Sequence, residues 1–125
     1  LFGWFNSSGT WGNSGGACLN LAPQSRWSTE EVLWAYSETN MSSYMSVLVP
    51  TSSLNELRID GQRVITMLEL VEPPITVNSE LSLVIVRMTA GSHHVTRPEP
   101  AFPMMYGRID AGTGGFAAYA YSQVW

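Results

Sequence analysis

Short apolar runs and alternating apolar and polar positions recur along this chain, and Gly, Pro, Asn or Asp residues separate them. A period of two places successive side chains on opposite faces, which is typical of a β-strand with one buried face. The pattern predicts six strands, over residues 44–49, 54–59, 63–71, 81–89, 102–109 and 116–125, and a further short strand around 17–21. Many short strands separated by turn signals indicate an antiparallel β-sandwich or a jelly roll.

Breaker residues set the expected limits of these strands. Pro50 ends the first of them, and Gly91 turns the chain after residues 81–89. That run is apolar on both faces at its centre, so we expect it to be an inner strand of the sheet. Proline fixes φ and lacks a backbone donor, so an extended, irregular connection is predicted around the proline-rich stretch Pro98, Pro100 and Pro103.

The pair Asp60-Gly61 lies between two apolar runs and predicts a β-hairpin. A type I′ turn requires positive φ at both central positions, which Asp and Gly tolerate better than other residues. A two-residue loop would place Arg58 opposite Arg63, and like charges in that position are unfavourable. A slightly longer loop through Gln62 is therefore the alternative.

The segment after Trp27 carries the one helix signal of the chain. Ser28 and Glu31 have the spacing of a capping box, and Trp27 and Val32 occupy the staple positions around it. We expect a short helix of about two turns that ends by residues 37–40. A strand over residues 32–36 is the alternative interpretation.

The length of the chain, 125 residues, is that of one domain. We therefore expect a single all-β domain over residues 1–125, with at most one short helix. The first five residues, Leu-Phe-Gly-Trp-Phe, are too apolar for a free terminus. For this reason we expect the domain to be cut from a longer protein, as its C-terminal or surface part.

Charge excludes several classes of partner. The net charge is −4, and the six basic residues are all Arg. Nucleic-acid binding needs clustered Lys and Arg, so nucleic acid is not an expected partner, and a basic membrane-surface helix is excluded for the same reason. No apolar run approaches 18 residues, so membrane insertion is not expected. Cys18 is the one cysteine, which rules out an internal disulfide.

A glycine-rich run, Gly12-Asn13-Ser14-Gly15-Gly16, resembles the Gly-Asp-Ser-Gly-Gly run of trypsin-like serine proteases, with Asn13 in place of the Asp. A serine nucleophile also needs a histidine base and a carboxylate that orients it. A complete protease of that type does not fit in 125 residues, and the flanks do not suit a nucleophile elbow. We therefore expect no enzyme, no catalytic residue and no cofactor.

The adjacent pair His93-His94 is the nearest approach to a metal site. Neighbours on a strand point to opposite faces, so the two rings cannot easily bind one ion, and zinc needs three or four ligands. We expect no metal here. With Arg97 nearby, the two histidines are instead candidates for an acid-sensitive contact.

Aromatic residues are abundant in a chain with few charges. There are 14 aromatic residues and 6 Met, and charged residues make up 13% of the chain, about half the usual share. Aromatic residues and Met are enriched at interface cores, whereas Lys is depleted there. We therefore expect a homodimer or homotrimer, with Trp4, Trp11 and Trp125 as candidate contact residues. A platform of aromatic rings that stacks on sugars is the alternative.

In its strand spacing the chain resembles the surface domains of virus particles, namely protruding domains of icosahedral capsids and fibre heads. The resemblance spans residues 44–49, 54–59, 63–71, 81–89 and 116–125. It implies a location on the virion surface, oligomers and attachment to a host-cell receptor, for which a glycan is one candidate, without catalysis. The candidate receptor contacts are His93, His94, Arg97 and Thr113.

Two other functions are compatible with the sequence. The first is a carbohydrate-binding module or lectin-like domain, which would be secreted or extracellular and would expose aromatic side chains. The second is a small serine hydrolase built on Ser14, which lacks the sequence context described above. The sequence upstream of Leu1 would discriminate between the viral surface domain and the carbohydrate-binding module. A shell domain there would support the first, and a catalytic domain would support the second.

Overall fold

The computed structural model describes residues 21–36, 41–109 and 118–122. Their regular structure is antiparallel β-sheet with short 3₁₀ turns, which confirms the predicted all-β class. The strands are β1 (Ser28–Ala35), β2 (Met41–Pro50), β3 (Arg58–Ile59), β4 (Gln62–Arg63), β5 (Ile75–Thr76), β6 (Leu81–Met88), β7 (Gly91–Ile109) and β8 (Ala118–Tyr121). The 3₁₀ turns are η1 (Gln24–Arg26), η2 (Thr51–Glu56) and η3 (Val64–Thr66).

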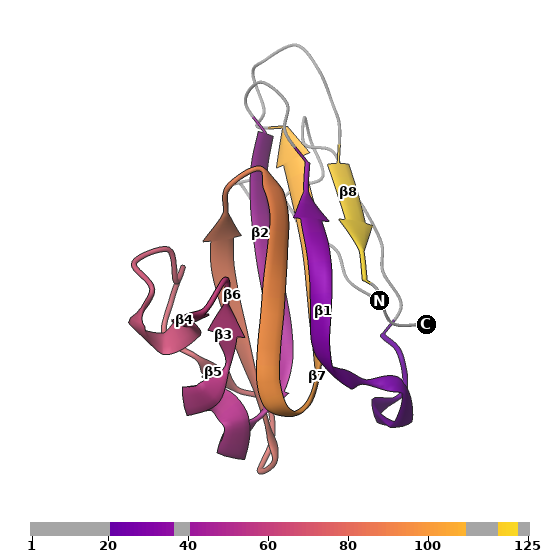
Figure 1. Cartoon of the computed structure of the whole chain (residues 1–125), viewed down its shortest axis with the longest axis vertical. Helices are drawn as coiled ribbons and strands as arrows, with labels where there is room; N and C mark the ends of the chain where they lie inside the picture. The colour runs from indigo at the N-terminus through magenta and orange to yellow at the C-terminus, as the bar shows by residue number, and fades with distance from the viewer. Residues whose placement is uncertain (1–20, 37–40, 110–117, 123–125) are drawn as a thin grey trace.

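The long strand β7 connects the two halves of the sheet. Its first part pairs with β1 and β3, and its second part pairs with β2 and β8. Between them the strand bends back in a U around Pro98–Pro100, beside β1 (Figure 1). The three prolines were expected to lie in an irregular connection, and this prediction was wrong: they lie within β7, where Pro98 and Pro100 flank the bend.

One apolar core lies between the two halves. Leu33 of β1 and Val95 of β7 belong to the same buried cluster as Val47 of β2, Val84 of β6 and Met105 of the second part of β7. The two halves of the curled sheet therefore face each other across a shared core, as in a sandwich. Burying a side chain of this size stabilises a fold by about 1.5–3 kcal/mol.

Three of the predicted strands lie within or almost coincide with observed ones, and residues 102–109 form the second part of β7. Residues 44–49 lie within β2, and residues 81–89 correspond to β6. Strand β6 has β2 on one side and β5 on the other, which confirms that it is an inner strand. One face of β6 is buried in the core, and the other is partly exposed.

The hairpin at Asp60-Gly61 is confirmed. Strands β3 and β4 pair through Arg58 opposite Arg63, and φ is +53° at Asp60 and +83° at Gly61. The alternative of a longer loop was therefore wrong. The two guanidinium groups avoid each other because Arg58 donates to the Gly61 carbonyl (3.0 Å), whereas Arg63 donates to the Asn55 carbonyl (2.8 Å).

The strands beside the hairpin are much shorter than expected. Residues 54–59 and 63–71 were predicted to be strands, but most of each segment forms 3₁₀ turns or irregular chain. The reason lies in packing: Leu54 and Leu57 reach the core from the end of η2, three residues apart, as a 3₁₀ turn allows. Alternation by itself could not reveal this.

The helix predicted after Trp27 does not exist, and the alternative of a strand is confirmed. Residues 28–35 form β1, which pairs with β7. The capping-box residues do meet, but through their side chains, because Ser28 Oγ donates to Glu31 Oε1 (2.6 Å). Trp27 packs on Phe102 of β7, with ring centroids 5.8 Å apart. Pairing with a distant strand overrode the local helix signal.

Strand β8 connects the two halves of the sheet, because it pairs with the second part of β7 and its tyrosine side chains bond β1 and the residue after it. Of the predicted strand 116–125, Ala118–Tyr121 form β8 and Ser122 follows the strand, while residues 116–117 and 123–125 lie outside the described part of the chain. The Tyr121 hydroxyl accepts from the Trp34 N–H and donates to the Trp34 carbonyl, and the Tyr119 hydroxyl accepts from the Tyr36 N–H (3.0 Å). These bonds lie on the side of β1 that β7 does not pair with, where Figure 1 shows β8 next to β1.

Candidate functional site

The two adjacent histidines of β7 lie on opposite faces of the sheet, as the strand geometry requires. His93 is buried, whereas His94 is exposed. The Nδ1 atom of His93 lies 2.7 Å from Asp60 Oδ2, and its Nε2 lies 2.7 Å from the Thr89 carbonyl oxygen. His94 Nε2 lies 2.9 Å from Glu30 Oε2 of β1 on the outer face.

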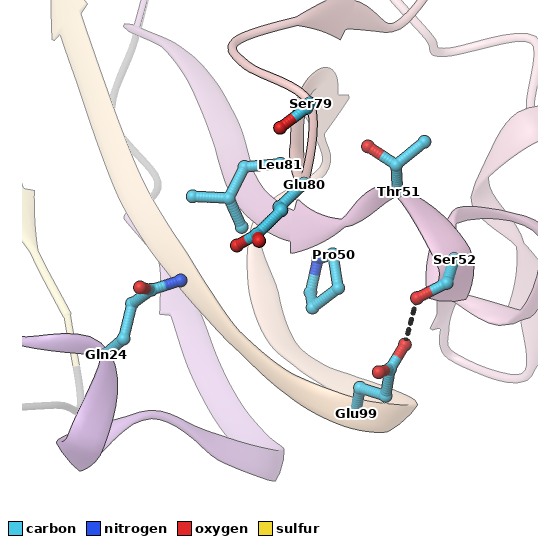
Figure 2. A pocket seen from close by; sticks show the side chains of 8 residues that line it. All are labelled: Gln24, Pro50, Thr51, Ser52, Ser79, Glu80, Leu81 and Glu99. Atoms are coloured by element: carbon cyan, nitrogen blue, oxygen red, sulfur yellow. Dashed lines mark hydrogen bonds between the residues drawn. The ribbon is translucent and has the colours of Figure 1, made fainter.

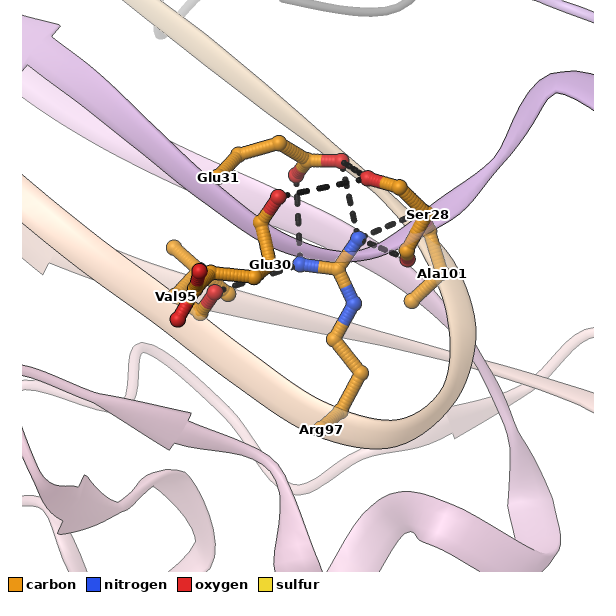
Figure 3. Close-up of polar contacts among 6 residues, drawn as sticks. All are labelled: Ser28, Glu30, Glu31, Val95, Arg97 and Ala101. Atoms are coloured by element: carbon orange, nitrogen blue, oxygen red, sulfur yellow. Dashed lines mark hydrogen bonds and ion pairs between the residues drawn. The ribbon is translucent and has the colours of Figure 1, made fainter.

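Arg97 is buried at the bend of β7 and holds β1 there. Its guanidinium group makes a bidentate pair with Glu31, through contacts of 2.9 and 3.1 Å. It also donates to the carbonyls of Ser28, Val95 and Ala101 (Figure 3). A charge with this many partners inside the chain serves the fold and is not available to a ligand.

The predicted receptor contacts differ in their exposure to solvent. Of the three on β7, His94 reaches the surface, whereas His93 and Arg97 are 7% and 5% exposed and bond within the chain. A receptor cannot reach these two groups while the fold is intact. The fourth candidate, Thr113, lies outside the described residues, as do the expected interface tryptophans Trp4, Trp11 and Trp125.

An exposed apolar surface lies on the outer face of β1. It consists of Val32 and Trp34 of β1 and of Tyr36 directly after the strand, which are 54%, 59% and 57% exposed, and it is called the β1 face below. The intervening Leu33 and Ala35 are buried, so strict alternation puts the three side chains on one side. The Glu30–His94 pair borders this surface, because His94 is opposite Val32 in the register.

Sequence reasoning did not find the β1 face as a site. Residues 32–36 are apolar without interruption, so the sequence shows no polar position that would mark an outward face. The helix signal just before them also pointed to a different period. The alternative interpretation of residues 32–36 as a strand gave the one indication of this face, because alternate side chains of a strand point to opposite sides.

A second surface feature is a pocket of about 400 Å³ near the bend of β7. Its walls come from the β2–η2 junction, the turn before β6, η1 and the β7 bend (Figure 2). The lining residues are Gln24, Pro50, Thr51, Ser52, Ser79, Glu80, Leu81 and Glu99. None of these is cationic, so the pocket suits neutral polar or cationic groups and disfavours anions.

The carboxylate of Glu99 has a defined position in this pocket. The hydroxyls of Ser52 and Ser53 both donate to its Oε2 atom. The hydrogen bond from Ser52, followed by that from Ser53, lowers the pKa of Glu99 and outweighs the opposing effect of desolvation. Glu99 is therefore ionised at neutral pH. Sequence spacing gave no indication of this site, because its residues come from four separate segments.

Within residues 21–36, 41–109 and 118–122, no group of three or more His, Cys, Asp or Glu side chains is placed to hold a metal ion. In the same part of the chain, no helix is long and apolar enough to cross a membrane.

Comparison with known proteins yields no relative. No protein-family model, curated protein or solved structure matches the chain. The physical features of the chain therefore carry the functional argument.

Proposed function

We propose that this chain is a non-enzymatic surface domain of a virus particle, of the capsid-spike or fibre-head type, that attaches to a receptor on the host cell. The observation that carries the proposal is the β1 face: Val32, Trp34 and Tyr36 are more than half exposed on one side of a strand. Large apolar side chains grouped on a surface mark interaction sites, and Trp and Tyr are enriched among the residues that dominate binding energy.

The framework behind this face favours binding over chemistry. Strand β1 is paired with β7 along its length, and tyrosine hydroxyls bond its other edge at Trp34 and Tyr36. A surface held in this way loses little conformational entropy on association. His94 and Glu30 border the face and supply polar contacts at its rim, so the proposed receptor contacts are His94 and the β1 face.

A carbohydrate-binding module is the second candidate function, and one observation favours it. Trp34 and Tyr36 are exposed two residues apart, and the hydrogen-bonding groups of His94 and Glu30 lie at the Val32 end of the same face. Flat aromatic side chains bury the apolar face of a sugar ring, while neighbouring polar groups bond its hydroxyls. In this reading the domain is extracellular and its receptor is a glycan.

Cell binding tests the proposal. Fluorescently labelled domain is added to cultured cells from several hosts, before and after enzymatic removal of their surface glycans. We expect binding to at least one cell type, and Trp34→Ser should reduce it at least tenfold because a central aromatic contact contributes 2 kcal/mol or more, about a 30-fold change in affinity. Loss of binding after glycan removal would identify a glycan receptor.

The matched control is Leu68→Ser. Leu68 is 97% exposed in the loop after η3 and does not belong to the β1 face, so its replacement removes an exposed apolar side chain and leaves the three side chains of that face in place. This variant should bind cells as the unmodified domain does. Equal losses in both variants, or no binding to any cell type, would contradict the proposal.

A further inference from the structure

We propose that the Asp60–His93 pair is a pH-sensitive latch that holds the β3–β4 hairpin onto β7 more tightly while the imidazole of His93 is protonated. The inference is independent of the proposed function, because it rests on contacts inside the fold. Its central observation is that both ring nitrogens of a buried histidine face acceptor atoms.

The contacts of His93 define its protonation state. Its Nε2 lies 2.7 Å from the carbonyl oxygen of Thr89, which can only accept a hydrogen bond. Its Nδ1 lies 2.7 Å from Oδ2 of Asp60. A neutral imidazole has one N–H and one lone pair, so it would place a lone pair against one of these oxygens. The geometry is satisfied when both nitrogens donate.

Asp60 is suited to the anionic half of the pair. Desolvation raises its pKa, but the hydrogen bond from the His94 N–H (2.8 Å), the hydrogen bond to His93 and the nearby histidine charges together outweigh this and lower it. Asp60 is thus a carboxylate at neutral pH and cannot supply the missing proton to Nδ1.

The latch acts on a weakly attached element. Strand β3 has two residues, and it pairs with β7 only through Arg58 opposite Thr96 and Ile59 opposite Val95. One further backbone bond runs from the Asp60 N–H to the His94 carbonyl (2.8 Å). Loss of the positive charge on His93 would therefore weaken one of the few contacts that hold the hairpin on β7, and with it the burial of Ile59.

Among the described charged side chains around His93, Asp60 contacts the imidazole, whereas the others bond to different groups. Beside it on β7, Arg97 is paired with Glu31 of β1, and His94 with Glu30 of β1 on the opposite face. On the hairpin, Arg58 bonds to the Gly61 carbonyl and Arg63 lies 3.7 Å from Glu56. Arg87 of β6 is exposed, and its N–H bonds to the Glu69 carbonyl.

The sign of the pH effect follows from proton linkage. In the unfolded chain an imidazole loses its proton near pH 6.5, whereas the folded latch needs that proton. Stability from the latch is therefore fully present where the imidazole of the unfolded chain is also protonated, and it is lost as the pH rises beyond that. At acid pH the carboxylate of Asp60 also contributes to stability, because its pKa is lowered in the folded state. This contribution is complete above pH 3.8, the ordinary pKa of the group, and is lost as the pH falls through the lower folded pKa.

Nuclear magnetic resonance of the imidazole nitrogens tests the protonation state in the unmodified protein. At pH 6 both ring nitrogens of His93 should show the shifts of protonated nitrogen with cross-peaks to two N–H protons. The chain has two histidines, so His94→Gln assigns the signals. A neutral ring with one unprotonated nitrogen in folded protein at pH 6 would overturn the proposal.

Denaturant unfolding between pH 5.5 and 8.5 tests the linkage. The unfolding equilibrium constant of the unmodified domain should rise with pH, by at most tenfold per unit for one linked proton. His93→Gln should abolish that rise, whereas the control His94→Gln, on the exposed side, should keep it. A slope that persists in His93→Gln, with only a uniform loss of stability, would show a merely structural role and overturn the latch.

Discussion

Among the described residues, Arg97 and Glu31 form the one ion pair in which both side chains are almost wholly buried, being 0% and 6% exposed. The pair joins β1 to the bend of β7, where prolines limit the number of backbone bonds. Buried charges are costly unless they are fully paired, so each partner depends on the other.

Replacing Arg97 by Met should therefore lower the free energy of unfolding by about 3–5 kcal/mol, because it leaves the Glu31 carboxylate buried without its partner. Chemical denaturation at pH 7 measures this change. The double variant Arg97→Met/Glu31→Leu should recover a large part of the loss, since neither charge remains. Equal losses in the single and double variants would show that the pair itself is not responsible.

At the scale of elements, the hairpin depends on the backbone conformation of Gly61. Its φ is +83°, and no atom lies within 4 Å of the position that an added Cβ would take. Gly61→Val should cost more than about 1 kcal/mol, because a β-branched residue resists positive φ even where space is free. Gly61→Asn is the control and should cost less, because Asn tolerates this region. Stability of Gly61→Val within error of the unmodified protein would contradict the turn assignment.

Strand β8 is attached to β1 by side chains in place of a backbone ladder. The Tyr121 hydroxyl bonds both the N–H and the carbonyl of Trp34. Tyr121→Phe should destabilise the protein by about 1–2 kcal/mol, because it removes two hydrogen bonds at an edge. The Trp34 amide should also exchange with solvent faster. Tyr44→Phe, in which the lost hydroxyl has no hydrogen bond in the described part of the chain, is the control and should change neither.

The same contact is sensitive to alkaline pH. Desolvation raises the pKa of Tyr121, the hydrogen bond to Trp34 opposes this, and the nearby Tyr119 adds to it. The folded state thus favours the neutral phenol. Its contribution to stability is complete below the ordinary pKa of tyrosine, about 10, and is lost as the pH rises through the higher folded value.

At the scale of the whole molecule, we expect self-association from the excess of aromatic residues over charges. Sedimentation at micromolar concentration should show a dimer or trimer, and Trp4→Ser, Trp11→Ser or Trp125→Ser should shift the protein toward monomer. Trp34→Ser should not, since the β1 face is proposed for the receptor. If Trp34→Ser alone dissociates the oligomer, the β1 face is a contact between copies. A strict monomer would contradict self-association.

Several features of this protein could be predicted from local sequence because local chemistry decides them. Asp60-Gly61 supplies the two positive φ angles that a two-residue turn needs, so the hairpin was found with its central residues. The run from Leu81 to Met88 is apolar on both faces at its centre, and the inner position predicted from this pattern is confirmed, because β2 and β5 pair with its two edges. The opposite orientation of His93 and His94 also follows directly from strand geometry.

Other features were decided by partners far away in the chain. Ser28–Ala35 is a strand because β7 pairs with it some sixty residues later, and this pairing overrides a local capping signal. The register then decides that Val32 and Trp34 face solvent while Leu33 is buried, although all three are apolar. The bend of β7 likewise brings Arg97 to Glu31, and the β3 hairpin brings Asp60 to His93. Sequence determines which side chains are available, but pairing between distant segments determines which are buried together, because burial depends on register and register is a property of two strands at once.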